Sequence, residues 1–344
     1  MKLCLITNYS NRAYINESLI FDKLIDTLNI STEDIFNILD VNSVYKVNKK
    51  YTHSLILFDY KSTSISPFQS YLSEVKIPKI FIIDTIPQFH KELDIKFSKD
   101  ILNGSLSQLT LLSISHQTLL YEKYADGFVF YNKGDINLFS SYYNLNSQKP
   151  AICILPSLGS KQDIKINFEN FNLNKNIGFN GSPSYSNGLF SIASTLMTLP
   201  QYHMNLYGSH GRNDLNNETL INNITYSNPN IKFKGKLKNY NRFFNENHIY
   251  HNITLYDSCN YFTIISLLNG VVPILSKNSN TLEYIPSYPF TSDHSVDSIQ
   301  STLSNIINTP KNELKDILNS TIPSLQRFND EDTKTLYFNF LNSF

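Results

Sequence analysis

Cysteine is scarce in this chain, and the few cysteines present stand apart from one another. The three (Cys4, Cys153 and Cys259) lie singly in apolar segments, and no CxxC pair occurs. Isolated buried thiols are typical of a reducing compartment, so we expect a cytoplasmic protein. Without clustered cysteines we expect no structural metal.

Long hydrophobic runs are also missing. The longest apolar stretches are KIFIID and VVPIL, far below the ~20 residues that a membrane-spanning helix needs. The opening MKLCLITNYS turns polar after six residues, which predicts a first buried strand and not a secretion signal. We therefore expect a protein without a membrane span, and we expect it to be a monomer.

An excess of either charge is absent as well. Lys and Arg number 29, Asp and Glu number 29, and the formal net charge is +0. No overall basic field therefore indicates a nucleic-acid partner, although a local groove can be basic on a neutral protein. At 344 residues the chain exceeds the size at which one core keeps growing, so two domains are expected.

The second half of the chain alternates strands, glycine turns and helices. A predicted strand at 177–179 runs into Gly181 and Ser182, and a helix with one apolar face is predicted at 188–199. The strand HMNLYG then ends on Gly208. This alternation of strands, glycine turns and helices is typical of an open parallel sheet, whose ligands bind at the carboxyl ends of the strands. Small turns of this kind can direct backbone N–H groups at a phosphate.

The alternation continues as far as Glu283. Further strands are predicted at 230–237, 252–257 and 271–276, separated by a charged helix and the apolar helical run TIISLL. The fold class predicted for this half is α/β with a parallel, Rossmann-like sheet.

The first half shows two candidate catalytic carboxylates. A strand at 2–8 precedes a predicted helix whose first turn holds Glu17, and a buried strand at 79–83 ends on Asp84. An acid at the carboxyl end of a central strand is where an α/β protein places a catalytic base. The structural alternatives are that the helix dipole alone favours Glu17 and that Asp84 only forms its own turn.

Two segments organise the rest of the chain. The stretch 157–175 lacks periodicity and is interpreted as a linker between domains. Two amphipathic helices are predicted at 310–325 and 330–344.

Taken in order, these segments resemble the GT-B glycosyltransferases, and within that group the DNA β-glucosyltransferases of T-even phages. The similar segments run from end to end: NESLIFDKLID with Glu17, KIFIIDTIP with Asp84, then FNGSPS, NLYG and KFKGKL. Each motif is weak alone, and their shared order carries the resemblance. It implies two Rossmann-like domains with parallel sheets that face a central cleft, at 1–165 for the acceptor and 166–330 for the nucleotide sugar. The terminal helix at 331–344 would cross back to the first domain.

The resemblance also implies an activity. Enzymes of this group transfer glucose from UDP-glucose, with inversion, to the hydroxymethyl group of a modified cytosine in double-stranded DNA. Asp84 would be the base that accepts the proton of the acceptor hydroxyl, and a phage-encoded enzyme would work in the host cytoplasm. No tightly bound cofactor is implied beyond the UDP-sugar co-substrate, and Mg²⁺ or Mn²⁺ at the diphosphate stays open.

Donor binding follows the resemblance only in part. Gly181, Ser182 and Gly208 would supply backbone contacts, and Lys236 with Leu237 matches the segment that contacts the nucleoside. The cations expected after the first strand of this half are missing from SPSYSNG. The remaining candidates for the diphosphate are Arg212, Lys236, Lys238 and Arg242, each of which is also explained as a plain surface charge.

Two other functions stay open at this point. The acceptor can be a cell-surface glycan or a protein instead of DNA, which the neutral charge favours, or the chain can be a non-catalytic binding protein. Among the histidines of the second half, His203, His248 and His251 are interpreted as surface or turn residues, and His210 as the one nearest the donor.

Overall fold

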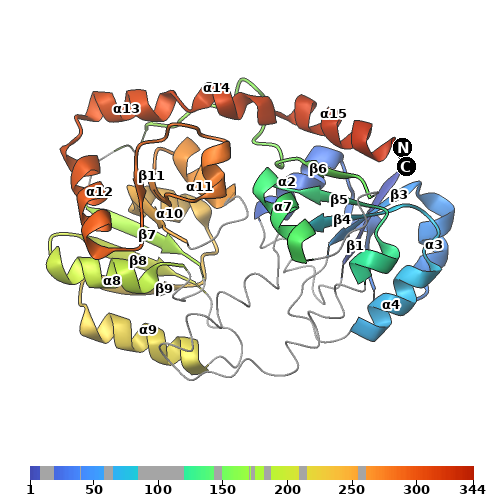
Figure 1. Cartoon of the computed structure of the whole chain (residues 1–344), viewed down its shortest axis with the longest axis horizontal. Helices are drawn as coiled ribbons and strands as arrows, with labels where there is room; N and C mark the ends of the chain where they lie inside the picture. The colour runs from blue at the N-terminus through green and yellow to red at the C-terminus, as the bar shows by residue number, and fades with distance from the viewer. Residues whose placement is uncertain are drawn as a thin grey trace. The chain divides into compact units, whose positions relative to one another are not determined.

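The computed structural model describes residues 1–7, 19–38, 40–57, 65–83, 120–142, 149–169, 171, 175–181, 187–208, 215–254 and 261–344 (Figure 1). Its contacts divide the chain into two compact units. The N-unit comprises Met1–Gly159 with Phe328–Phe344, and the C-unit comprises Ser160–Arg327.

The N-unit is built on a parallel sheet of six strands in the order β2-β1-β3-β4-β5-β6. The strands are β1 (Leu3–Thr7), β2 (Ile35–Asn37), β3 (His53–Leu57), β4 (Lys79–Ile83), β5 (Gly127–Phe130) and β6 (Ala151–Cys153). β4 lies between β3 and β5, and all of its residues after Lys79 are buried. Strands covered on both faces read as continuous apolar runs, which is why KIFII was recognisable in the sequence.

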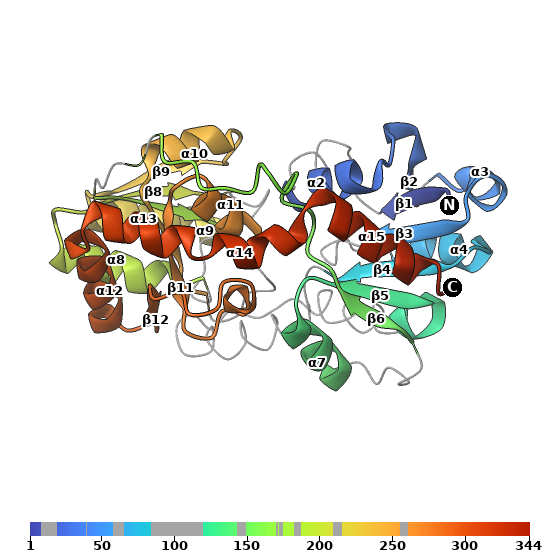
Figure 2. The ribbon, with the colours of Figure 1, turned by 90° about the horizontal axis from the view of Figure 1, so that it is seen from above.

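The helices described in the N-unit are α2 (Leu19–Leu28), α3 (Ser43–Lys50), α4 (Ile65–Glu74), α7 (Lys133–Tyr142) and α15 (Asp330–Leu341). The rings of Tyr121, Phe128 and Phe139 contact one another in edge-on or tilted arrangements in the core of this unit. The last helix, α15, packs against α2, so the two ends of the chain lie beside each other (Figures 1 and 2).

The C-unit holds a second parallel sheet of six strands, in the order β12-β11-β10-β7-β8-β9. The strands are β7 (Asn176–Asn180), β8 (His203–Tyr207), β9 (Ile231–Gly235), β10 (Ile249–Asn252), β11 (Val272–Ser276) and β12 (Thr291–Ser292). Its described helices are α8 (Leu189–Thr198), α9 (Leu215–Ser227), α10 (Tyr240–Glu246), α11 (Tyr261–Leu268), α12 (Val296–Asn308), α13 (Lys311–Asn319) and α14 (Ile322–Leu325). Two parallel Rossmann-like sheets confirm the predicted α/β fold class.

One predicted strand is wrong. The strand expected at 252–257 begins where β10 (Ile249–Asn252) already ends. All four residues of β10 are buried, including His251 and Asn252, and the Asn252 side chain donates to Thr263 Oγ1 at 2.9 Å. A strand whose polar residues find partners inside the protein does not show the apolar pattern on which the prediction relied.

The segment interpreted as a linker is packed over much of its length. Ile164, Ile166 and Phe171 are buried, and the Asn167 N–H donates to the Leu268 carbonyl at 2.8 Å. The chain passes from the N-unit to the C-unit between Gly159 and Ser160. Among the described helices, none combines the length and hydrophobicity that crossing a bilayer requires.

Candidate functional site

In the parallel sheet of the C-unit, the order in which strands are added reverses at β7. From β7 the chain builds β8 and β9 on one side, and β10, β11 and β12 follow on the other. In such a sheet, ligands bind outside the carboxyl ends of the strands at the point where the order reverses. The candidate site is therefore the carboxyl edge of β7 and β10.

Three of the predicted donor residues lie at the carboxyl ends of β7, β8 and β9 in the same sheet. Gly181 directly follows β7, Gly208 follows β8, and Lys236 follows β9. The register pairs Asn180 with Tyr207 and Tyr207 with Gly235, so the three strands end at the same level. The structure thus brings together residues that are up to 55 positions apart in the sequence.

The N–H groups of Gly181 and Gly208 are already used in hydrogen bonds within the sheet. The Gly181 N–H donates to the Tyr207 carbonyl at 3.1 Å, and the Gly208 N–H donates to the Gly235 carbonyl at 3.1 Å. A Cβ at Gly181 would meet nothing closer than Asn187 and Phe179, both at 3.7 Å. A phosphate here would therefore need N–H groups other than these two.

Helix α8 begins at the same point of the sheet. Its N-cap residue, Gly188, has a φ of 70°, and a Cβ there would overlap the Ile253 carbonyl oxygen just beyond β10. Only glycine combines this left-handed conformation with such a close approach. The first N–H groups of a helix have no acceptor within it and carry partial positive charge, so α8 directs a favourable field at an anion on this edge.

The buried side chain of His251, a residue of β10, contacts the start of α8. His251 is 1% exposed, its Nε2 lies 3.3 Å from the Gly188 carbonyl, and its ring stacks on Phe179 with 6.0 Å between centroids. Burial lowers the pKa of His251 to about 3, and neighbouring His294 adds to the effect. His251 is therefore neutral at physiological pH.

Two buried polar atoms in the described part of the C-unit lack a partner. His251 Nδ1 and Thr254 Oγ1 complete no hydrogen bond with the described residues. Burial lowers the pKa of His294, while the Thr254 backbone and the Asp293 carboxylate act in the opposite direction. Buried polar atoms nearly always have partners in proteins, so His251 Nδ1 and Thr254 Oγ1 are exceptions in the core of the C-unit.

The expectation of surface histidines is wrong for two of the three that the structure describes. His248 is 6% exposed and His251 is 1% exposed, whereas His203 lies exposed on β8 as expected. Ile249 and Tyr250, which are good strand formers, separate the two buried histidines. That signal could have placed a strand here.

Two further predicted donor residues, Arg242 and Leu237, make contacts within the protein. Arg242 Nε donates to Glu246 Oε1 at 2.7 Å, and the Tyr207 hydroxyl donates to Glu246 Oε2 at 2.8 Å. Burial raises the pKa of Glu246, but these two hydrogen bonds and the nearby cations outweigh it and keep the pKa below its ordinary value. Leu237 packs on the aromatic cluster that contains Phe243. A diphosphate would have to compete with Glu246 for Arg242.

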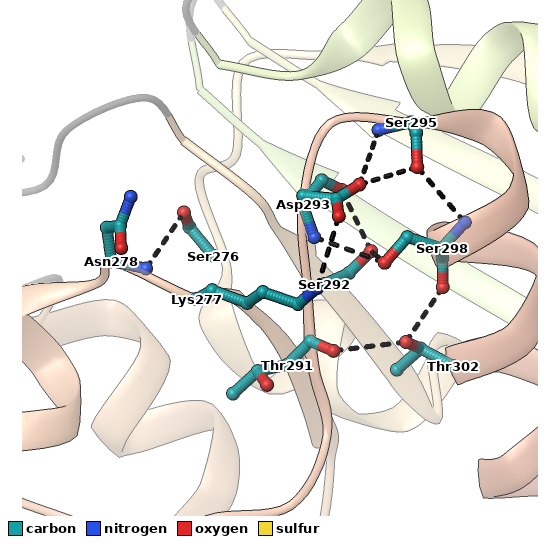
Figure 3. Close-up of polar contacts among 9 residues, drawn as sticks. All are labelled: Ser276, Lys277, Asn278, Thr291, Ser292, Asp293, Ser295, Ser298 and Thr302. Atoms are coloured by element: carbon teal, nitrogen blue, oxygen red, sulfur yellow. Dashed lines mark hydrogen bonds and ion pairs between the residues drawn. The ribbon is translucent and has the colours of Figure 1, made fainter.

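Sequence reasoning missed a polar network at the ends of β11 and β12 (Figure 3). Asp293 accepts from Lys277 Nζ at 3.1 Å, from the Ser295 N–H at 2.9 Å and from the Ser295 hydroxyl at 2.5 Å. The hydrogen bonds from Ser295 and Lys277 hold the pKa of Asp293 well below its ordinary value. Lys277 is thus a cation at the carboxyl edge whose charge Asp293 already balances.

Four of the predicted site residues, Glu17, Asp84, Ser182 and Arg212, lie outside the described residues, as does His210. β4 ends at Ile83, one position before Asp84. Among the described residues no group of three or more His, Cys, Asp or Glu side chains could hold a metal ion.

Comparison with known proteins identifies the fold. No protein-family model matches the chain, and no curated protein matches it in sequence. Anabaena Alr3699/HepE, solved in complex with UDP-glucose, is similar with a TM-score of 0.72 and 12% identity over 100% of both chains. A UDP-forming α,α-trehalose-phosphate synthase from Burkholderia xenovorans is similar with a TM-score of 0.66 and 11% identity, over 99% of this chain and 100% of that one.

A third similar structure is the sucrose-phosphate synthase of Thermosynechococcus elongatus, with a TM-score of 0.67 and 10% identity over 94% of this chain and 79% of that one. The chain therefore has the fold of the GT-B glycosyltransferases.

Proposed function

We propose that the protein is a glycosyltransferase that uses a UDP-sugar, with glucose as the first candidate sugar, and that the C-unit binds the donor. The main observation behind this proposal is the close approach of Gly188, at the start of α8, to the Ile253 carbonyl. This approach occurs at the point where the strand order of the C-unit reverses. This is where dinucleotides and nucleotides bind in related sheets. Similar structures hold UDP and UDP-glucose, which supports the same class of ligand.

The chemistry of transfer requires charge to be stabilised on the leaving UDP. The positive end of α8 and the ammonium of Lys236 supply this along the carboxyl edge. Lys277 contributes less, because Asp293 balances its charge. A requirement for Mg²⁺ or Mn²⁺ at the diphosphate stays open, and loss of transfer on addition of EDTA would show it.

The acceptor side of the proposal rests on the sequence resemblance. Asp84 would accept the proton of an acceptor hydroxyl, a role in which a positioned carboxylate is typically worth 10²–10⁴-fold. The first acceptor to test is a hydroxymethylated pyrimidine in double-stranded DNA. A free sugar, a sugar phosphate, a cell-surface glycan or a protein is the alternative, which the net charge of +0 favours.

The stereochemical course of the transfer, inversion or retention, is a separate question. The resemblance to the phage enzymes implies inversion, whereas a similar trehalose-6-phosphate synthase structure is described with transfer by retention. The anomeric configuration of the product, measured by NMR, would decide between them. With inversion, Asp84→Asn should lower turnover at least about a hundredfold with little change in donor affinity. A wild-type rate in that variant would remove Asp84 as the base.

Donor binding is tested before transfer. Calorimetry should show that UDP and UDP-glucose bind the protein, and transfer is then assayed with hydroxymethylated DNA and with sugar and sugar-phosphate acceptors. Absence of UDP binding at millimolar concentration would overturn the donor assignment and favour a non-catalytic binding protein. Binding without transfer to DNA, but with transfer to a sugar, would replace the acceptor and keep the reaction class.

A further inference from the structure

The N-unit contains a cavity at the amino edge of its sheet, opposite to the end at which β4 reaches Ile83. Its volume is about 360 Å³, and Lys2 and Leu3 at the start of β1 form one wall. The carboxyl edge, where β4 ends at Ile83, is the other end of the same parallel sheet. This cavity is therefore separate from the acceptor position that the sequence predicts, and its volume falls at the small end of the range for ligand sites.

Part of the wall is apolar. Leu3, Leu28 and Ile30 are buried at 9%, 5% and 5% exposure, and the ring of Phe338 on α15 completes this side. Such a wall can hold the hydrocarbon body or the ring of a small molecule.

The charged part of the wall contains three lysines and one aspartate: Lys2, Lys50, Lys334 and Asp34. Asp34 accepts from Lys50 Nζ at 2.9 Å, from the Tyr51 hydroxyl at 2.5 Å and from the Ser31 hydroxyl at 2.6 Å. Burial raises the pKa of Asp34, but these hydrogen bonds outweigh it and hold the pKa well below its ordinary value. Asp34 and Lys50 thus satisfy each other within the wall.

Two lysines of the wall, Lys2 and Lys334, remain after this pairing. Lys50 also offsets the negative carboxyl end of α3, in whose last turn it lies. Lys2 forms no ion pair with the described residues, and Lys334 contacts a neutral amide. With the Asn29 amide oriented to satisfy both of its neighbours, Asn29 accepts from Lys334 Nζ at 2.8 Å and donates to the Asp26 carbonyl at 3.3 Å. Because the Asn29 amide carries no net charge, it positions the Lys334 ammonium without neutralising the charge that would attract an anion.

We propose that this cavity binds a small organic anion, with a phosphate or carboxylate group on Lys2 and Lys334 and an apolar or ring-shaped body against Leu28, Ile30 and Phe338. The cavity joins β1 and α2 to α15, which comes from the other end of the sequence. A bound anion would therefore stabilise the attachment of α15 to the N-unit. This site is independent of donor binding in the C-unit.

Phenyl phosphate is a suitable probe, because it combines both halves of the proposed ligand. In calorimetry on the full chain it should bind at least tenfold more tightly than inorganic phosphate or benzyl alcohol, each of which offers one half only. In the same experiment, saturating UDP should leave its affinity unchanged. Phenyl phosphate that binds no better than phosphate, or that UDP displaces, would overturn the proposal.

A pair of variants locates the site. Lys334→Gln should weaken phenyl phosphate about tenfold or more. Lys123→Gln should leave it unchanged, although Lys123, like Lys334, lies over an aromatic ring of the N-unit. Hydrogen exchange should show that phenyl phosphate protects α15 in the wild type and in Lys123→Gln. Equal loss of affinity in both variants, or unchanged exchange in α15, would contradict the assignment, and the melting temperature of each variant controls for folding.

Discussion

Ser157 and Asp330 are 173 positions apart in the sequence, yet the Ser157 hydroxyl donates to Asp330 Oδ1 at 2.6 Å. Two backbone hydrogen bonds accompany this contact, from the Leu158 N–H to the Phe328 carbonyl at 2.9 Å and from the Asp330 N–H to the Gly159 carbonyl at 3.0 Å. The chain therefore leaves the N-unit and returns to it at one place, where the returning segment starts α15.

Ser157→Ala should loosen α15. The substitution removes a hydroxyl that donates to the Asp330 carboxylate and accepts from the Gly159 N–H at 3.0 Å. Loss of these partly buried contacts should cost about 1 kcal/mol, which makes opening of α15 about fivefold more frequent. Hydrogen exchange in α15 should rise by that factor. Ser160→Ala is the matched control, because its hydroxyl donates to Asp163 at 2.6 Å within a local turn. Equal exchange of α15 in the two variants would show that the contact does not hold the helix.

Gly188→Ala should destabilise the C-unit more than Gly235→Ala. Both glycines have left-handed backbones, with φ of 70° and 73°, so both variants carry a strain of about 1–2 kcal/mol. A Cβ at Gly235 meets nothing within 4 Å, whereas a Cβ at Gly188 overlaps the Ile253 carbonyl. The free energy of unfolding from urea titrations should be lower in Gly188→Ala by at least a further ~1 kcal/mol. Similar values in the two variants would contradict the close approach of α8 and β10.

Acid should destabilise the protein through His251. The folded-state pKa of about 3 lies below the ordinary value of 6.5, so the unfolded chain takes up a proton that the folded chain excludes. This contribution to stability is complete above pH 6.5 and is lost as the pH falls from 6.5 towards 3. Between pH 7 and pH 5 the loss should be about 2 kcal/mol, measured by urea unfolding.

Two variants isolate that effect. His251→Phe keeps an aromatic ring against Phe179 and removes the titrating group, so its free energy of unfolding should fall less between pH 7 and pH 5. His203→Phe changes an exposed histidine of the same unit and should keep the wild-type pH dependence. If His251→Phe retains the full wild-type loss, His251 is not the group responsible.

Lys236→Ala should weaken the donor more than it slows turnover. Lys236 lies at the carboxyl edge just after β9, where its charge would attract the diphosphate of the UDP-sugar before as well as during transfer. The Michaelis constant for the UDP-sugar should rise about tenfold, with a smaller fall in turnover. Lys232→Ala removes an exposed lysine near the amino end of the same strand and should change neither. A larger effect on turnover than on the donor constant would assign Lys236 to the chemical step.

The amino-acid pattern alone determined the alternation of strands and helices. KIFII and the helix after Gly188 were predictable because a parallel strand buried on both faces is continuously apolar and a covering helix repeats its apolar residues along one face. The glycines after β7 and β8 were predictable as turn residues at strand ends. None of these signals depends on distant parts of the chain.

Tertiary structure decided the features that join distant residues. His251 carries a polar side chain, and only its position between Phe179 and the Gly188 carbonyl explains why it is buried and neutral. The pairing of Arg242 with Glu246 and of Lys277 with Asp293 likewise decides how much of the charge of Arg242 and Lys277 a ligand can use. The charge that a side chain can offer depends on the partners that surround it after folding, and the local sequence does not specify those partners.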